Sequence, residues 1–122
     1  MKRTITLGIT LGDVGGIGPE VAVKAALGLK WPGHVRLVLV GSRAVVDACC
    51  RRARIPPPPA WTPGSPFPAN VVVWDPVLCP GLRAAPGQCR ADAARWAVVW
   101  IRAAVQACMT GALDGMVTAP IN

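Results

Sequence analysis

Apolar and polar positions alternate with two different periods along the chain, and the two periods predict strands and helices in turn. Residues 4–10 are apolar at every second position, which is the period of a β-strand. Residues 35–40 are almost continuously apolar, which is typical of a strand buried on both faces of a parallel sheet. Two shorter apolar runs predict further strands at 70–74 and 115–119.

A helix is predicted after each of the first two strands. Pro19 suits the first position of a helix that should end near residue 30, because the N–H that proline lacks would be unpaired there. Ser42 is the predicted N-cap of a second helix over 43–54. Five residues of the first helix are expected to face the core: Val21, Ala22, Ala25, Ala26 and Leu29.

The longest predicted helix spans residues 91–109 and has only a narrow polar stripe. A helix with so little polar face should be buried between layers or against another subunit. Trp96 and Trp100 are one helical turn apart and are expected to pack in the core. Gly111 suits the C′ position at which this helix would end.

The order of these elements predicts an α/β fold with a layered, mostly parallel sheet flanked by helices. A proline-rich stretch at about 56–69 is expected to be an extended surface connection. Because a sheet of about four strands would normally continue, residues 1–122 are predicted to be one segment of a longer protein.

Composition narrows the class of protein. Hydrophobic residues make up 52% of the chain and charged residues 16%, which argues against a disordered protein. The net charge of +7 favours anionic partners, but the basic residues are scattered, which speaks against nucleic acid. Their one tight cluster, Arg51, Arg52 and Arg54, falls at a helix end, where cations stabilise the helix dipole. A phosphorylated small molecule suits the charge equally well.

The five cysteines are odd in number and form no C-x-x-C pair, so neither a disulfide framework nor a zinc site is expected. Free thiols indicate a reducing compartment, and the chain is therefore predicted to be cytoplasmic. The first residues lack the apolar core and the cleavage site of a signal peptide, and no apolar run is long enough for a membrane span.

The sharpest motif is G-D-V-G-G-I-G-P-E at residues 12–20, which follows the first predicted strand and opens the first predicted helix. Ligands of α/β proteins bind at this place, where glycines let the backbone approach them and the N–H groups of a helix start attract anions. The carboxylate of Asp13 could accept hydrogen bonds from hydroxyls of a substrate or cofactor, or pair with a cation.

The spacing of the glycines differs from two common phosphate-binding loops. It is not the G-x-G-x-x-G of a dinucleotide loop, and it is not a P-loop, because no Lys-Ser or Lys-Thr follows. A purely structural glycine turn therefore stays an alternative. The final segment, D-G-M-V-T-A-P-I-N at 114–122, delivers the hydroxyl of Thr118 and the amide of Asn122 to the same sheet edge. By itself this segment is typical of an ordinary strand end.

Together, the two motifs resemble those of the 4-hydroxythreonine-4-phosphate dehydrogenase family. Gly12, Asp13 and residues 16–20 match the family pattern, whereas Val14 and Gly15 stand where the family usually has proline and a small residue such as alanine. The resemblance implies an isocitrate/isopropylmalate dehydrogenase-like fold and a homodimeric enzyme. It also implies oxidation, with decarboxylation, of 4-phosphohydroxy-L-threonine by NAD or NADP with a divalent metal, in pyridoxal 5'-phosphate biosynthesis.

The resemblance implies that residues 1–122 are the amino-terminal α/β segment of a longer dehydrogenase. It places the metal-binding histidines and a substrate-binding His-Thr pair beyond residue 122. No catalytic residue or metal ligand is therefore assigned within the chain, which is expected to be inactive by itself, and His34 is expected to be a loop residue. Two hypotheses stay open: a dehydrogenase for another four-carbon sugar-acid phosphate or a ring dihydrodiol, and a non-catalytic truncated fragment. The implied substrate or cofactor cleft would be lined by Asp13, Gly15, Gly16, Gly18, Thr118 and Asn122.

Overall fold

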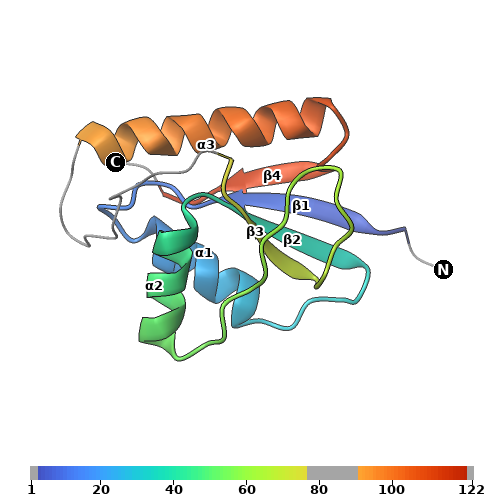
Figure 1. Cartoon of the computed structure of the whole chain (residues 1–122), viewed down its shortest axis with the longest axis horizontal. Coiled ribbons are helices and arrows are strands. Elements are labelled where there is room, and N and C mark those ends of the chain that lie inside the picture. The colour runs from blue at the N-terminus through green and yellow to red at the C-terminus, as the bar shows by residue number, and fades with distance from the viewer. Residues whose placement is uncertain (1–2, 77–90, 121–122) are drawn as a thin grey trace.

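The protein folds into three layers in a computed structural model that describes residues 3–76 and 91–120. Helices α1 and α2 cover one face of the sheet and α3 covers the other (Figure 1). All strand pairs within the described residues are parallel, which confirms the predicted layered α/β fold. The elements are β1 (Ile5–Thr10), α1 (Gly18–Leu27), β2 (Val35–Val40), α2 (Arg43–Ala53), β3 (Val71–Trp74), α3 (Ala91–Met109) and β4 (Gly115–Thr118).

The strands lie in the order β3-β2-β1-β4, so β1 has β2 on one side and β4 on the other. The chain moves outward from β1 through β2 to β3, and then crosses the opposite face through α3 to reach β4. The direction of winding therefore reverses between β1 and β4. In parallel α/β sheets, ligands bind outside the carboxyl ends of the strands at such a switch point.

Helix α1 is shorter than the sequence pattern predicted. It ends at Leu27, and the N–H of Gly28 donates a hydrogen bond to the carbonyl of Lys24. The prediction that Val21 and Leu29 face the core is wrong, because Val21 lies beside the buried stripe and Leu29 lies beyond the helix end. The buried stripe follows helical spacing and contains Pro19, Ala22, Val23 and Ala26.

Helix α3 has the predicted bounds and packs on the sheet through small residues and one large residue. Trp96 packs against the core beside the fully buried Trp100, as predicted. Gly111 has a φ of 86° just after the helix, which confirms its predicted position. The buried stripe of α3 contains Ala97, Trp100, Ala104 and Ala107.

None of the helices in the described ranges is long and apolar enough to cross a membrane.

Part of the proline-rich connection pairs with the sheet. The N–H of Trp61 donates to the carbonyl of Val73 (2.8 Å), and the N–H of Val73 donates to the carbonyl of Pro59 (2.9 Å). The indole of Trp61 is buried and stacks on Phe67, with ring centroids 4.7 Å apart. The connection therefore covers the outer edge of β3. The sequence analysis did not anticipate this pairing, because the two segments carry no shared local pattern.

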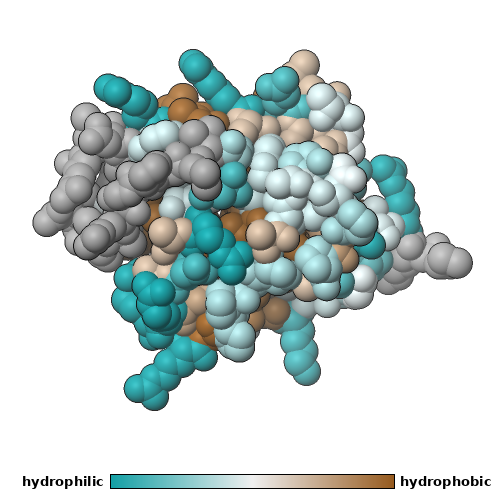
Figure 2. All heavy atoms as spheres, viewed as in Figure 1, coloured by the Kyte–Doolittle hydropathy of each residue, from teal (hydrophilic) through white to brown (hydrophobic). Residues whose placement is uncertain are grey.

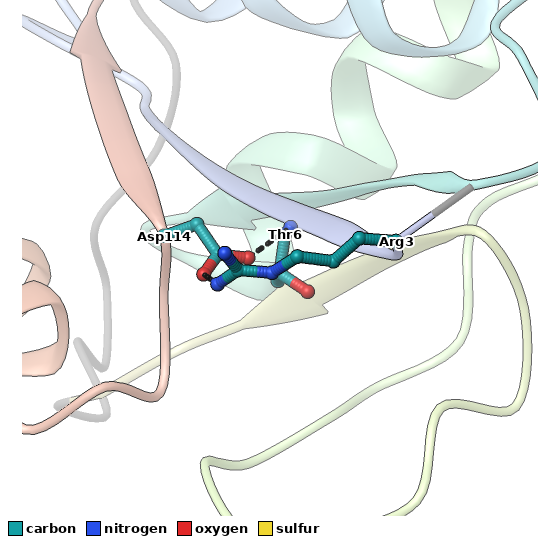
Figure 3. Close-up of polar contacts among 3 residues, drawn as sticks. All are labelled: Arg3, Thr6 and Asp114. Atoms are coloured by element: carbon teal, nitrogen blue, oxygen red, sulfur yellow. Dashed lines mark hydrogen bonds and ion pairs between the residues drawn. The ribbon is translucent and has the colours of Figure 1, made fainter.

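The carboxylate of Asp114 fastens the start of β4 to β1 (Figure 3). Its Oδ2 accepts a hydrogen bond from the N–H of Thr6 (2.8 Å), and the N–H of Asp114 donates to the carbonyl of Thr6 (2.8 Å). Its Oδ1 pairs with the exposed guanidinium of Arg3 at 3.1 Å. These contacts support the register in which Leu7 lies opposite Gly115.

Replacing Asp114 with alanine is expected to lower the free energy of unfolding by about 1.5 kcal/mol, because the N–H of Thr6 loses a charged acceptor. Asp114→Asn should keep that hydrogen bond and lose only the ion pair with Arg3, which is solvent-exposed and contributes little. Urea unfolding of the two variants measures the difference. Equal losses would contradict the hydrogen bond to Thr6 as the main contribution of Asp114.

Candidate functional site

The glycine-rich bend after β1 meets the end of β4 at the switch point. The N–H of Asp13 donates to the carbonyl of Pro120 at 3.3 Å, and the N–H of Ala119 donates to the carbonyl of Thr10 at 3.0 Å. Gly12 has a φ of 76°, and a Cβ atom there would lie 2.4 Å from the carbonyl oxygen of Pro120. Only glycine allows so close an approach in this conformation. The two sequence motifs are therefore in direct contact.

Asp13 is fully buried inside the bend. Its Oδ1 accepts a hydrogen bond from the N–H of Gly15 (2.8 Å), and its carbonyl accepts one from the N–H of Gly16 (3.0 Å), so it organises the turn. Its Oδ2 has no hydrogen-bond partner among the described residues. A buried carboxylate oxygen without a donor costs free energy, so this atom is suited to a donor group of a ligand or to a cation.

Thr10, the last residue of β1, is a second buried polar residue at this edge. Its Oγ1 has no hydrogen-bond partner in the part of the chain that the structure describes. A Cβ atom on Gly8 would lie 2.7 Å from the side chain of Leu113, which follows α3 in the chain. Because residues two apart share one face of a strand, Thr10 lies on the same face of the sheet as Gly8, toward α3. The sequence analysis did not single out Thr10. The available signal was a hydroxyl at the end of a buried strand, directly before the glycine motif.

The start of α1 is better suited to an anion than the start of α2. In α2 the Oγ of Ser42 accepts a hydrogen bond from the N–H of Val45 (3.3 Å), which confirms the predicted N-cap. The Oδ2 of Asp75 accepts another from the N–H of Arg43 (3.0 Å). In contrast, α1 has Ile17 at its N-cap and no side-chain cap. Since uncapped N–H groups and the helix dipole attract negative charge, an anionic group is expected to bind at α1.

Glu20 adds a negative charge to the first turn of α1. Its carboxylate forms an ion pair with Lys24 at 2.8 Å, and the hydrogen bond and charge of Lys24 lower the pKa of Glu20. Gly18 lies against Pro120, and Glu20, two residues further on, lies on another side of the helix. An anion is therefore expected on the side of the bend, away from Glu20.

The structure brings together only part of the predicted cleft. Thr118 is exposed at the last position of β4, where it pairs with Thr10, and Asn122 lies outside the described residues. The N–H groups of Gly15 and Gly16 already donate to Asp13, so they hold the turn. That the six predicted cleft residues bind a substrate or cofactor stays a prediction. Four of the six lie in the bend or at the start of α1, namely Asp13, Gly15, Gly16 and Gly18.

The cysteines give no sign of a reactive centre in the described ranges. Cys49, Cys50 and Cys108 are free thiols, and the other two cysteines lie outside these ranges. Burial raises the pKa of Cys49 and Cys50, so both thiols are protonated at neutral pH. His34 lies in the loop before β2. Among the side chains described in residues 3–76 and 94–120, no three of His, Cys, Asp or Glu could hold a metal ion together.

The chain is similar in sequence to two kinds of dehydrogenase. It is 35% identical to the D-threonate 4-phosphate dehydrogenase of Bordetella bronchiseptica over 129 residues, which cover 99% of this chain and 36% of the relative. It is 36% identical to the 4-hydroxythreonine-4-phosphate dehydrogenase of a Synechococcus species over 121 residues, which cover 94% of this chain and 33% of the relative. The chain spans about a third of the length of these relatives. No protein-family model matches it.

Solved structures agree with the sequence comparison. The 4-hydroxythreonine-4-phosphate dehydrogenase from Burkholderia phymatum matches with a TM-score of 0.79 and 25% identity, over 99% of this chain and 38% of that one. The same enzyme from Klebsiella pneumoniae matches with a TM-score of 0.76 and 25% identity, over 98% and 38%. These findings confirm the resemblance that the two motifs carry. The relatives are dehydrogenases by name, as that resemblance implied.

Proposed function

We propose that this chain, which is related to the 4-hydroxythreonine-4-phosphate dehydrogenases over nearly its whole length, forms part of an NAD- or NADP-dependent enzyme that oxidises a four-carbon phosphorylated hydroxy acid. The observation that carries the proposal is the contact at the switch point. There Gly12 and Asp13 meet Ala119 and Pro120, beside a helix start that has no side-chain cap. Enzymes with α/β sheets bind phosphate-bearing molecules at such switch points and at helix starts.

The proposed substrate is 4-phosphohydroxy-L-threonine, oxidised and decarboxylated in pyridoxal 5'-phosphate biosynthesis. The alternative is D-threonate 4-phosphate, because the relative named for that substrate is about as similar to this chain. Both molecules are four-carbon acids with a hydroxyl group and a phosphate ester. One carries an amino group where the other carries a second hydroxyl, so residues around that carbon would decide between them.

In this proposal the groups of the chain bind and orient the ligands. The uncapped N–H groups of α1 bind an anionic group of the substrate or cofactor. The Oδ2 of Asp13 accepts a hydrogen bond from a ligand hydroxyl, while Thr118 and Asn122 line the opposite wall. The nicotinamide, when bound, takes the hydride that leaves the substrate carbon. The described residues suit an anionic group but offer no set of metal ligands, so no step here depends on the metal, whose ligands would lie beyond residue 122.

The oligomeric state and the location of the whole protein are part of the same proposal. A homodimer is proposed because the resemblance implies it, and a cytoplasmic location is proposed because the buried thiols of Cys49 and Cys50 suit a reducing compartment. The alternative from a different class is a non-catalytic fragment. That alternative concerns the 122-residue chain by itself.

A chimera tests the proposed function. This chain replaces the matching third of the Synechococcus enzyme, and the formation of reduced nicotinamide is followed with a divalent cation and each of the two substrates. Turnover of either substrate supports the proposal, and the preferred one identifies the substrate. A chimera that unfolds cooperatively, yet turns over neither substrate, would argue for the non-catalytic alternative.

Asp13→Asn in the chimera is expected to lower kcat/KM at least about 100-fold while leaving the fold nearly as stable. The side-chain oxygen of asparagine still accepts the N–H of Gly15, but its amide group places a donor where Oδ2 was. The control is Asp114→Asn, at the amino end of the sheet, which should not change kcat/KM. Similar activities of the two variants would remove Asp13 from the proposed site.

A further inference from the structure

The connection between α2 and β3 begins with four consecutive prolines at residues 56–59. Proline fixes φ at about −65°, and a residue that precedes a proline avoids the helical region, as residues 55–58 all must. These two restrictions favour the polyproline II conformation, an extended left-handed helix with about three residues per turn. Residues 55–59 belong to neither an α-helix nor a strand, which agrees with that conformation.

The burial of this segment follows the same period. Ile55, Pro58 and Trp61 lie at intervals of three residues; Ile55 is partly buried, and the other two are buried. The residues between them are exposed and form the proline ridge, which consists of Pro56, Pro57, Pro59 and Ala60. One edge of the polyproline helix therefore packs on the protein, and its other two edges face solvent.

Backbone hydrogen bonds hold both ends of the segment. The N–H of Ile55 donates to the carbonyl of Cys50 (2.9 Å), and the N–H of Val73 donates to the carbonyl of Pro59 (2.9 Å). The proline ridge is therefore fixed in its extended conformation before any partner binds. A segment that is ordered in advance loses little conformational entropy on binding, so it is a better ligand than a flexible chain of the same sequence.

Positive charge lies next to the proline ridge. Arg51 and Arg54 are exposed at the end of α2, directly before the prolines. The ion pairs of the described residues involve Arg3, Lys24 and Arg43, and not these two arginines. Figure 2 shows long teal side chains projecting from the lower left of the molecule, where α2 ends in Figure 1. A partner with acidic residues is therefore favoured.

A second copy of this chain does not have the matching surface. Its own aromatic hollow, of about 460 Å³, begins at Ala60 and contains Trp61 and Phe67. Trp61 is only 5% exposed, and the guanidinium of Arg36 lies 4.6 Å from the centre of the Phe67 ring. Both rings are therefore covered. A second copy would also bring like charges together, because the chain carries a net charge of +7.

We infer that the proline ridge binds a partner protein through an aromatic-lined groove with acidic residues at its rim. The exposed prolines pack on the aromatic side chains, as polyproline II ligands do, and the acidic residues pair with Arg51 and Arg54. The ridge lies beside β3, two strands away from β1, so the partner and the ligands of the candidate site bind at different places. The inference rests on the connection itself and not on the proposed reaction.

The test titrates this chain with a panel of SH3 and WW domains that have acidic residues beside their aromatic grooves, and calorimetry measures the affinity. Saturable one-to-one binding of at least one domain is expected. Replacing both Pro56 and Pro59 with alanine should weaken it at least about tenfold, because the ridge loses its packing groups. The matched control replaces Pro66 and Pro68, two other exposed prolines of the connection, and should leave the affinity unchanged. Equal losses in the two double variants would overturn the inference.

A charge reversal tests the arginines. Arg54→Glu should weaken the binding at least about tenfold, whereas Arg95→Glu, an equal change of net charge on exposed α3, should weaken it less than about twofold. Equal effects would overturn the inference, because net charge alone would then attract the partner. So would binding of a DNA duplex without binding of any domain of the panel. The full-length chimera carries the same variants, so the test is complete even if residues 1–122 do not fold by themselves.

Discussion

Gly12→Ala is expected to destabilise the protein by about 3 kcal/mol, a large share of the stability of a small domain. An alanine would have to adopt a φ of 76°, and its Cβ would lie 2.4 Å from the carbonyl oxygen of Pro120. Neither atom is at the end of a flexible side chain, so the bend and the end of β4 must move apart. Urea unfolding followed by tryptophan fluorescence measures the loss.

Two other glycines separate the contributions to this effect. Gly64 has a φ of 92° and no atom within 4 Å of a Cβ built on it, so Gly64→Ala reports the backbone strain alone, about 1 kcal/mol. Gly33 has open space and no positive φ, so Gly33→Ala should be nearly neutral. If Gly12→Ala costs no more than Gly64→Ala, the close contact with Pro120 does not exist in solution.

Trp100→Ala is expected to cost about 3–5 kcal/mol, because the indole is fully buried between α3 and the sheet and its removal leaves a cavity. Its Nε1 has no hydrogen-bond partner among the described residues. Trp100→Phe removes that unpaired donor together with part of the volume, so it should cost much less than Trp100→Ala. Thermal unfolding of the two variants measures both effects.

The control for Trp100 is on the same helix. Val98 is half exposed, so Val98→Ala should change the stability by less than about 0.5 kcal/mol. A loss at Val98 that approaches the loss at Trp100 would mean that the side chain of Val98 is buried in solution and would contradict the orientation of α3.

Much of the fold could be predicted from the sequence because its signals are local. The apolar run of β2 and the long apolar pattern of α3 appear at the predicted positions, and the caps at Ser42 and Gly111 were identified from single residues. The predicted core face of α1 was less accurate. Its apolar residues occupy several sides of the helix, so the pattern did not distinguish exposed Val21 from buried Val23.

The candidate site was predictable only in outline. The glycine motif indicated the bend. The sequence did not show that the carboxylate of Asp13 is buried in this bend and accepts a hydrogen bond from the N–H of Gly15. Thr10 was missed because a threonine at the end of a strand is common. Trp61 was missed because its burial depends on pairing with Val73, a residue of another segment.

The sequence by itself determined the order of the strands and helices and the need for a glycine-rich bend after β1, because periodicity, capping and backbone freedom act between near neighbours. Only the tertiary structure decided the strand order β3-β2-β1-β4, and with it the contact between Asp13 and Pro120. The physical reason is that strand pairing depends on the packing of helices on both faces of the sheet. Such pairing joins backbone groups far apart in the chain, and the local pattern of side chains does not indicate which backbone groups will pair.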